Sequence, residues 1–170
     1  DLLTTNVSSN TLSILIGNGD GTFHEQMQLH VCQEPRSLAT GAFNADPYPD
    51  IVLACAGGDQ IAVLLGRADG KFTEGPQYPV HRTPVSIASG DLNGDGMADL
   101  VVALRNDKIK VFLGQGTGEF RHGAQYELTL QAETLAVSGA NLPKADGVSG
   151  RDAVLARIEG LRHLVETLDL

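Results

Sequence analysis

The 170-residue chain has no tryptophan, few aromatic residues and little positive charge. Its 12 Lys and Arg residues are outnumbered by 21 Asp and Glu residues, which gives a formal net charge of −9 at pH 7. Because no cluster of Lys and Arg offers a footprint for phosphates, the sequence argues against binding to nucleic acid or to anionic membrane surfaces. No apolar run approaches the length needed to cross a bilayer, so we expect no membrane insertion.

Sequence motifs of the common enzyme classes are also missing. The chain contains neither Gly-x-Ser-x-Gly nor His-Glu-x-x-His. The glycine-rich segments 17–21 and 114–118 resemble a dinucleotide-binding fingerprint only superficially, because no helical pattern follows either of them. The five histidines are scattered, as expected for surface or strand-edge positions. We therefore predict that the chain is not an enzyme.

What the chain does contain is one pattern repeated about every 49 residues. It reads Asp-Leu-Leu-Thr-Thr from Asp1, Asp-Ile-Val-Leu-Ala from Asp50 and Asp-Leu-Val-Val-Ala from Asp99. Each copy is followed by a second apolar run and then by Gly-x-Phe, at 21–23, 70–72 and 118–120. Internal repeats of this length indicate an array of supersecondary units.

The best copy of the repeat predicts four short strands. They are Pro84–Gly90, Leu100–Leu104, Ile109–Leu113 and Tyr126–Leu130, separated by turns rich in Gly and Asp. The second is a continuous apolar run, as expected for a strand buried on both faces. Four antiparallel strands per unit are typical of a β-propeller blade. We predict an all-β fold: one propeller segment over 1–170, about three and a half four-stranded blades long, with units at approximately 1–34, 35–83, 84–131 and 132–170.

The last unit fits the repeat less well. Thr134–Gly139 resembles the first strand and Asp152–Ala156 the second, but the loop between them is four residues longer than in the preceding unit. Beyond it, the repeat register favours two strands turning at Glu159-Gly160, and a helical stripe is the alternative. The chain begins and ends inside units, so we expect a segment of a longer protein or a mature product cut from one. Unpaired sheet edges invite pairing, and we expect the rest of a longer chain or self-association to close the propeller.

The two cysteines are not part of the repeat. The positions 49 residues after Cys32 and Cys55 are His81 and Leu104, and there is no Cys-x-x-Cys motif to indicate a metal or redox role. A disulfide requires Cα atoms within about 7 Å of each other, which sequence alone does not reveal. Two buried thiols are the favoured interpretation, and a disulfide is the alternative.

The segment from Asp91 to Asp99 has the one pattern in the sequence that indicates a specific chemical function, the binding of a metal ion. Side-chain oxygens recur at alternate positions, a spacing that lets a tightly wound loop turn them onto one hard cation, with Gly96 permitting the sharp turn. Three carboxylates so close together would repel one another without a cation, so we predict Ca²⁺ rather than the alternative, an Asx-rich turn without metal. The predicted ligands are the side chains of Asp91, Asn93, Asp95 and Asp99 and the backbone carbonyl of Met97.

This is not an EF-hand, because the twelfth position is Val102 instead of Glu and the flanking runs are β-like. The preceding copy of the loop lacks the first carboxylate. Ala42 stands in place of Asp91, and Pro47 and Pro49 stiffen the turn. We predict a weaker second site there, with Asn44, Asp46 and Asp50 as its ligands.

The motif Asp91-Leu-Asn-Gly-Asp-Gly-x-x-Asp-Leu-Val-Val-Ala103, together with Leu65-Gly-x-x-Asp-Gly-x-Phe72, resembles the FG-GAP/VCBS repeat family. These are the propeller repeats of integrin α subunits and of many bacterial surface and secreted proteins. The resemblance implies four-stranded blades, usually seven in number, with calcium in the loop between the first and second strands. It also implies an extracellular, cell-surface or periplasmic setting.

Two functions are open at this point. We expect a calcium-stabilised extracellular module that binds or scaffolds a protein or glycan partner. The alternative is a lectin-like or accessory domain of a polysaccharide-active enzyme. Because sugar sites usually need exposed aromatic rings, an aromatic content of 5% without tryptophan weighs against the alternative.

Overall fold

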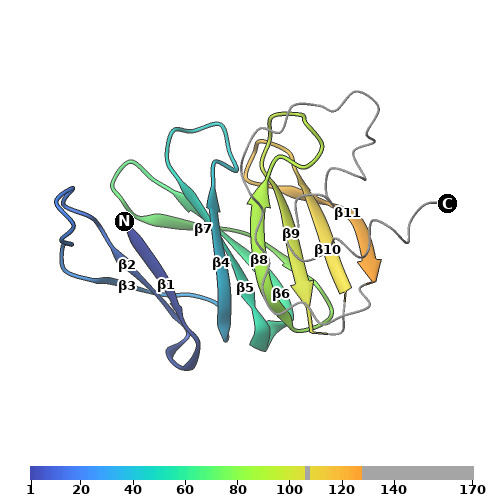
Figure 1. Cartoon of the computed structure of the whole chain (residues 1–170), viewed down its shortest axis with the longest axis horizontal. Coiled ribbons are helices and arrows are strands. Elements are labelled where there is room, and N and C mark those ends of the chain that lie inside the picture. Colours follow the sequence, from blue (N-terminus) through green and yellow to red (C-terminus); the bar gives the residue numbers. More distant parts are fainter. Residues whose placement is uncertain (106–107, 128–170) are drawn as a thin grey trace.

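The computed structural model describes residues 1–105 and 108–127, which form three β-sheets arranged side by side (Figure 1). Within each sheet every neighbouring pair of strands is antiparallel. The first sheet consists of β1 (Leu2–Asn6), β2 (Thr11–Leu15) and β3 (Met27–His30). The second consists of β4 (Pro35–Gly41), β5 (Asp50–Cys55), β6 (Gln60–Gly66) and β7 (Phe72–Pro79). The third consists of β8 (Pro84–Gly90), β9 (Asp99–Leu104), β10 (Lys108–Gly114) and β11 (Phe120–Glu127).

The second and third sheets confirm the predicted all-β fold of four-stranded antiparallel units. Their innermost strands β4 and β8 lie side by side, and these two sheets extend outward from them (Figure 1). Two single turns of 3-10 helix lie in equivalent places: η1 (Val7–Ser9) joins β1 to β2, and η2 (Ala56–Gly58) joins β5 to β6. The predicted unit 132–170, including the choice between strands and helix in its tail, lies outside the described residues. In the part of the chain that is described, no helix is long and apolar enough to span a membrane.

One predicted strand is wrong in its position. The fourth strand of the third unit begins at Phe120, six residues before the predicted start at Tyr126. The reason is the tightness of the preceding turn, where Gly116 and Gly118 have φ angles of 68° and 83°. The chain reverses within that turn, so that Phe120 already pairs with Gly114 and its ring is buried.

The predicted two-sided burial of the central strands is confirmed. Every residue of β5 and of β9 is buried, because alternate side chains point into different hydrophobic clusters. From β9, Leu100 and Val102 pack between the second and third sheets, while Val101 packs on the far face of the third. Each central strand therefore belongs to two interfaces at once.

The joint between the second and third sheets is built from aromatic side chains. The ring of Phe120 lies 5.4 Å from that of Phe43 and 6.1 Å from that of Tyr78, both in edge-to-face geometry. Backbone groups reinforce the joint: the Gly118 N–H donates to the Phe43 carbonyl at 2.7 Å, and the Phe120 N–H donates to the Tyr78 hydroxyl at 2.7 Å. Phe112, which is fully buried, belongs to the same cluster.

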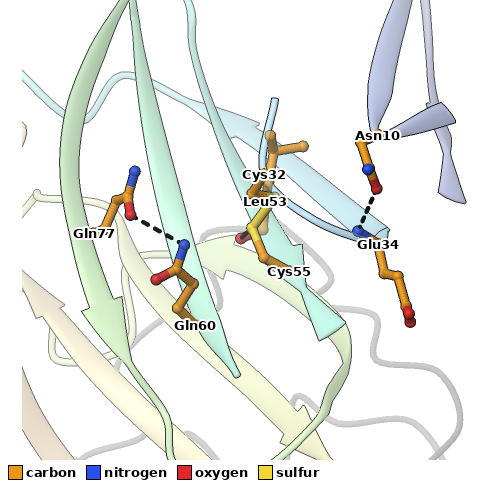
Figure 2. Close-up of a disulfide and its surroundings, with 7 residues drawn as sticks. All are labelled: Asn10, Cys32, Glu34, Leu53, Cys55, Gln60 and Gln77. Carbon is orange, nitrogen blue, oxygen red and sulfur yellow. Dashed lines mark hydrogen bonds between the residues drawn. A yellow bond between two sulfur atoms is a disulfide. The ribbon is translucent and has the colours of Figure 1, made fainter. Parts of the chain in front are cut away.

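The joint between the first and second sheets is held by a disulfide instead. Cys32 and Cys55 are bonded, with Cα atoms 5.8 Å apart, so the favoured interpretation of two buried thiols is wrong. The bond ties the connection that follows β3 to the end of β5. Figure 2 shows that Asn10 also holds this connection, because its Oδ1 accepts the Glu34 N–H at 2.8 Å. The pairing depends on a three-dimensional approach that the spacing in the sequence does not encode.

The far face of the first sheet carries a group of bonded polar side chains beside Leu2, which is exposed. Thr11 and Ser13 of β2 are buried, and their hydroxyls are bonded to neighbouring amides. The Asn6 side-chain nitrogen reaches both hydroxyls, at 3.0 and 2.7 Å, while Gln28 and Gln26 each reach one of them, at 3.0 and 2.6 Å. We call this group, Asn6, Thr11, Ser13, Gln26 and Gln28, the polar network.

We predict that reducing the disulfide destabilises the protein by roughly 2–4 kcal/mol, because the unfolded chain then regains the freedom of a closed loop. The sequence separation of the two cysteines is 23 residues. Thermal unfolding with and without dithiothreitol measures the effect. The Cys32→Ser/Cys55→Ala variant should unfold at the same temperature as the reduced protein, and dithiothreitol should not change its unfolding temperature. An identical melting curve in both buffers would contradict the prediction.

Candidate metal centre

The predicted ligands of the main site lie in the loop that joins β8 to β9, with Asp99 at the first position of β9. This loop is tightly wound, because Gly94 and Gly96 adopt the left-handed conformation, with φ angles of 81° and 85°. Both glycines donate their N–H groups to the carboxylate of Asp91, at 2.7 and 3.0 Å. The predicted role of Gly96 in a sharp turn is therefore confirmed, and Asp91 organises the turn around it.

Asn93 and Asp95 are exposed and bonded to each other. The Asn93 Oδ1 accepts the Asp95 N–H at 2.8 Å, and its Nδ2 donates to Asp95 Oδ2 at 2.9 Å. The remaining Asp95 oxygen accepts the Met97 N–H at 2.8 Å. The N–H of Met97, then the amide of Asn93 and more weakly the charge of Arg121, lower the pKa of Asp95. This carboxylate is thus held in its ionised form at the surface.

Asp99 is placed differently, with no exposed surface. Its Oδ2 accepts the Leu92 N–H at 3.0 Å and its Oδ1 accepts the Gly114 N–H at 2.8 Å. Burial raises the pKa of Asp99 above its ordinary value, and the charges of Asp95 and Asp91 raise it further, although the two N–H donors oppose this shift. Negative charge from three carboxylates therefore converges on one end of the loop.

The chemistry of these residues fits calcium. All the side-chain donors are oxygens, and a carboxylate oxygen that accepts one N–H retains a second lone pair for a cation. Over residues 1–105 and 108–127, however, no three His, Cys, Asp or Glu side chains already form a metal-holding group. The side-chain oxygens of residues 91–99 instead accept hydrogen bonds from the loop itself and, in Asp99, also from Gly114 at the end of β10. The side chains that would hold the ion are those of Asp91, Asn93, Asp95 and Asp99. The ion would supply positive charge beside the three carboxylates among them.

The second predicted loop shares part of this arrangement. Asn44 and Asp46 bond to each other as Asn93 and Asp95 do, and the Tyr48 N–H donates to Asp46 at 2.8 Å. No residue from 42 to 50 has a positive φ, however, and Ala42 offers no carboxylate to gather the turn. The loop is therefore wound less tightly and contributes fewer oxygens. A weaker site there stays a prediction.

The repeated aspartate has a role that the sequence analysis missed. In all three sheets its carboxylate accepts the N–H of a glycine near the end of the next strand: Asp1 from Gly17 at 2.8 Å, Asp50 from Gly66 at 2.9 Å, and Asp99 from Gly114. Asp50 also accepts the Phe43 N–H at 2.8 Å. We call this interaction the aspartate staple. Its signal in the sequence is the near-constant spacing from Asp to Gly, 16, 16 and 15 residues.

The glycine is required at the other end of the staple. A Cβ atom at Gly66 would overlap the carbonyl oxygen of Pro49, and one at Gly114 would overlap that of Ala98. Each of these carbonyls belongs to the residue just before the stapled aspartate. The absence of a side chain thus lets the acidic loop lie directly against the end of the third strand of its sheet.

Comparison with family models identifies the repeat. A model described as the FG-GAP-like repeat matches residues 42–102 and 91–142, which together span more than half of the chain. The chain belongs to the FG-GAP-like repeat family. The matched residues include both acidic loops, 42–50 and 91–99, strands β5 to β7 of the second sheet and the complete third sheet. The residues that match the FG-GAP-like repeat therefore include most of those that form the second and third sheets of the partial β-propeller.

The fold is also found among solved structures. A chain from the crystal structure of BBS1N in complex with ARL6DN, soaked with mercury, matches 76% of this FG-GAP-like chain with a TM-score of 0.52 and 13% sequence identity. The match spans 36% of that chain's length. At this identity the likeness shows the fold alone, a β-propeller of which this chain forms a part. No curated protein sequence matches the chain.

We predict that Asp99→Asn destabilises the protein even in EDTA. The side chain of Asn has a single acceptor oxygen, so its NH2 group faces either the Leu92 or the Gly114 N–H, which then loses its acceptor. Leaving one buried donor unpaired costs about 1–3 kcal/mol. The matched variant Asp95→Asn, at an exposed position in the same loop, should cost no more than about 0.5 kcal/mol under the same conditions. Urea unfolding in EDTA measures both. Equal losses in the two variants would show that Asp99 does not staple the sheet.

The raised pKa of Asp99 also predicts a pH dependence in the absence of metal. A carboxyl group whose pKa is higher in the folded than in the unfolded state stabilises the fold most at low pH, and this contribution is lost as the pH rises through the folded-state pKa. The difference in unfolding free energy between the wild type and Asp99→Asn should therefore shrink from about pH 3 to about pH 7 in EDTA. A difference that grows with pH would mean that the folded-state pKa is lowered.

Proposed function

We propose that this FG-GAP-like chain is a calcium-stabilised extracellular propeller module that binds or scaffolds a protein partner and carries out no catalysis. The observation that carries the proposal is the 91–99 loop. Its winding depends on left-handed Gly94 and Gly96, and its donors are all oxygens. Burial, and in addition the charges of Asp95 and Asp91, raise the pKa of Asp99. A divalent cation bound there would offset the repulsion among these carboxylates.

The position of the loop supports a structural role for the metal. The loop connects β8 to β9 and is bonded through Asp99 to the end of β10, so an ion held there ties three strands of one sheet together. Asn93 and Asp95 occupy the exposed side of the loop. An ion in this place is suited to stiffening the end of the blade.

The disulfide supports the proposed location. Disulfides persist in oxidising compartments and are rare in the cytosol, where thiols are kept reduced. The Cys32–Cys55 bond joins two sheets and is largely enclosed, which suits a permanent crosslink in a secreted or surface-exposed protein. The same setting supplies calcium at concentrations that fill weak sites.

A protein partner is supported by the fold. The solved relative is itself described in a complex of BBS1N with ARL6DN. Three kinds of protein partner fit this chain: the remainder of a longer propeller, another copy of the chain, or a separate protein. A glycan partner has less support, because Phe23 is the one large aromatic side chain with a strongly exposed surface in the described residues.

We predict that EDTA lowers the melting temperature, that added Ca²⁺ restores it, and that Asp95→Ala abolishes the response. The reason is that calcium binds the folded loop and not the unfolded chain, so saturation at about 100 times Kd adds roughly 2.7 kcal/mol. Differential scanning calorimetry in EDTA, Ca²⁺ and Mg²⁺ measures the shift. Glu119→Ala, which removes an exposed carboxylate outside the loop, should keep the full response. A melting curve unchanged by EDTA would refute a structural calcium.

A further inference from the structure

Asparagine followed by glycine occurs twice in the chain, as Asn18-Gly19 and as Asn93-Gly94. The first pair lies in the turn between β2 and β3, and the second lies in the 91–99 loop. In this dipeptide the backbone nitrogen of the glycine can attack the Cγ atom of the asparagine, because glycine has no side chain to block the approach. The attack releases the side-chain amide, and water is the only co-reactant.

The two pairs are alike in exposure and in backbone conformation. All four residues are exposed. Gly19 and Gly94 are both left-handed, with φ angles of 85° and 81°. Access of solvent and the conformation of the glycine therefore do not distinguish one pair from the other, whereas their hydrogen bonds do.

In the pair Asn93-Gly94 both reacting groups are held by hydrogen bonds. The Gly94 N–H donates to the Asp91 carboxylate at 2.7 Å. The Asn93 amide is bonded at both of its ends to Asp95, at 2.8 Å through its oxygen and at 2.9 Å through its nitrogen. Turning the Gly94 nitrogen onto the Asn93 Cγ atom would disturb all three of these bonds.

In the pair Asn18-Gly19 the attacking group is free. Among the residues that the structure describes, the Gly19 N–H makes no hydrogen bond. A Cβ atom placed on Gly19 would meet no atom within 4 Å outside its chain neighbours, so this peptide has room to rotate. The Asn18 amide is bonded through its nitrogen alone, to the Thr22 hydroxyl at 2.8 Å. Formation of the new ring therefore requires the loss of one hydrogen bond instead of three.

We propose that Asn18 is a site of spontaneous deamidation, and that the 91–99 loop protects Asn93 in the other pair from the same reaction. The Gly19 nitrogen gives its proton to water and forms a bond to the Asn18 Cγ atom. The bond from Cγ to Nδ2 breaks, and Nδ2 takes up a proton from water and leaves as ammonia. Water then opens the cyclic imide at either carbonyl, which leaves aspartate or isoaspartate at position 18.

The modification changes the turn between β2 and β3. The Thr22 hydroxyl donates its proton to Asp20 at 2.6 Å and accepts the Asn18 side-chain N–H with a lone pair. A carboxylate at position 18 has no proton for that lone pair, and it adds a negative charge beside that of Asp20. Isoaspartate also inserts a further carbon into the main chain, which disturbs the bond of 2.9 Å from the Asn18 N–H to the Thr22 carbonyl.

The test is incubation of the full chain in EDTA at mildly alkaline pH, followed at intervals by reduction, trypsin digestion and mass spectrometry. Cleavage after Arg36, Arg82 and Arg105 places the two asparagines in different peptides, so each sample contains its own control. We expect the amide of Asn18 to be lost at least about tenfold faster than that of Asn93, because two more hydrogen bonds oppose the reaction in the loop.

Variants test the cause of the difference. Asp91→Ala removes the acceptor of the Gly94 N–H and should speed the reaction at Asn93 by about threefold or more, with the rate at Asn18 unchanged. Glu119→Ala removes an exposed carboxylate outside the loop and should leave both rates as in the wild type. Asn18→Gln should stop the reaction in the first peptide, because the longer side chain has to form a larger ring. Circular dichroism confirms that the variants are folded.

Equal rates at the two asparagines, or a faster reaction at Asn93, would overturn the inference. A rate at Asn93 that Asp91→Ala does not change would also overturn it, since the hydrogen bond from Gly94 would then not be the source of the protection. Because the incubation contains EDTA, these outcomes are independent of calcium. The proposed binding function could therefore fail without changing any of them.

Discussion

The aspartate staple is the interaction on which the rest of this structure depends. A buried carboxylate is tolerated only when hydrogen bonds replace the water it has lost. Asp99 obtains them from the loop before its strand and from the glycine that ends the neighbouring strand. The two bonds together fix the loop and the end of β10 relative to β9. The acidic loop, the strand register and the direct approach of the backbone at Gly114 all follow from one side chain. The residue that completes the predicted calcium site is the same one that holds the sheet together without metal.

Much of this fold could be read from the sequence, because its main signals are periodic. The 49-residue repeat located the central strands, and unbroken apolar runs indicated burial on both faces. The misplaced start of β11 shows the limit of this reasoning, since the run Tyr126–Leu130 is more apolar than Phe120–Gln125, yet the turn at Gly116 and Gly118 decides where pairing begins. The disulfide escaped prediction because Cys32 and Cys55 meet only when two sheets pack. In the candidate site the types of ligand could be predicted from the sequence. The hydrogen bonds that Asp99 accepts from two backbone N–H groups could not.

The two joints between sheets solve one packing problem in different ways. Between the second and third sheets, Phe43, Phe112 and Phe120 fill the interface, and the Tyr78 hydroxyl satisfies a backbone donor. Between the first and second, the counterparts of Tyr78 and Phe120 are Leu29 and Phe72, so only one ring remains and an apolar cleft opens. The disulfide lies in this less filled joint. A covalent bond thus maintains the alignment of two sheets where side-chain volume does not, and it leaves the cleft accessible.

Because of the polar network, the outer faces of the first and third sheets differ in polarity. On the third sheet, the far face carries the apolar cluster of Ala88, Leu92, Val101, Ala103, Ile109 and Val111, the composition of an interface between blades. On the first sheet, the equivalent face carries hydroxyls and amides that satisfy one another. A flat apolar sheet laid on that face would gain little from excluding water and would have to accommodate polar groups that are already paired. The two outer faces of the described sheets therefore differ in chemistry: that of the third sheet is apolar, whereas that of the first combines mutually bonded hydroxyls and amides with the exposed side chain of Leu2.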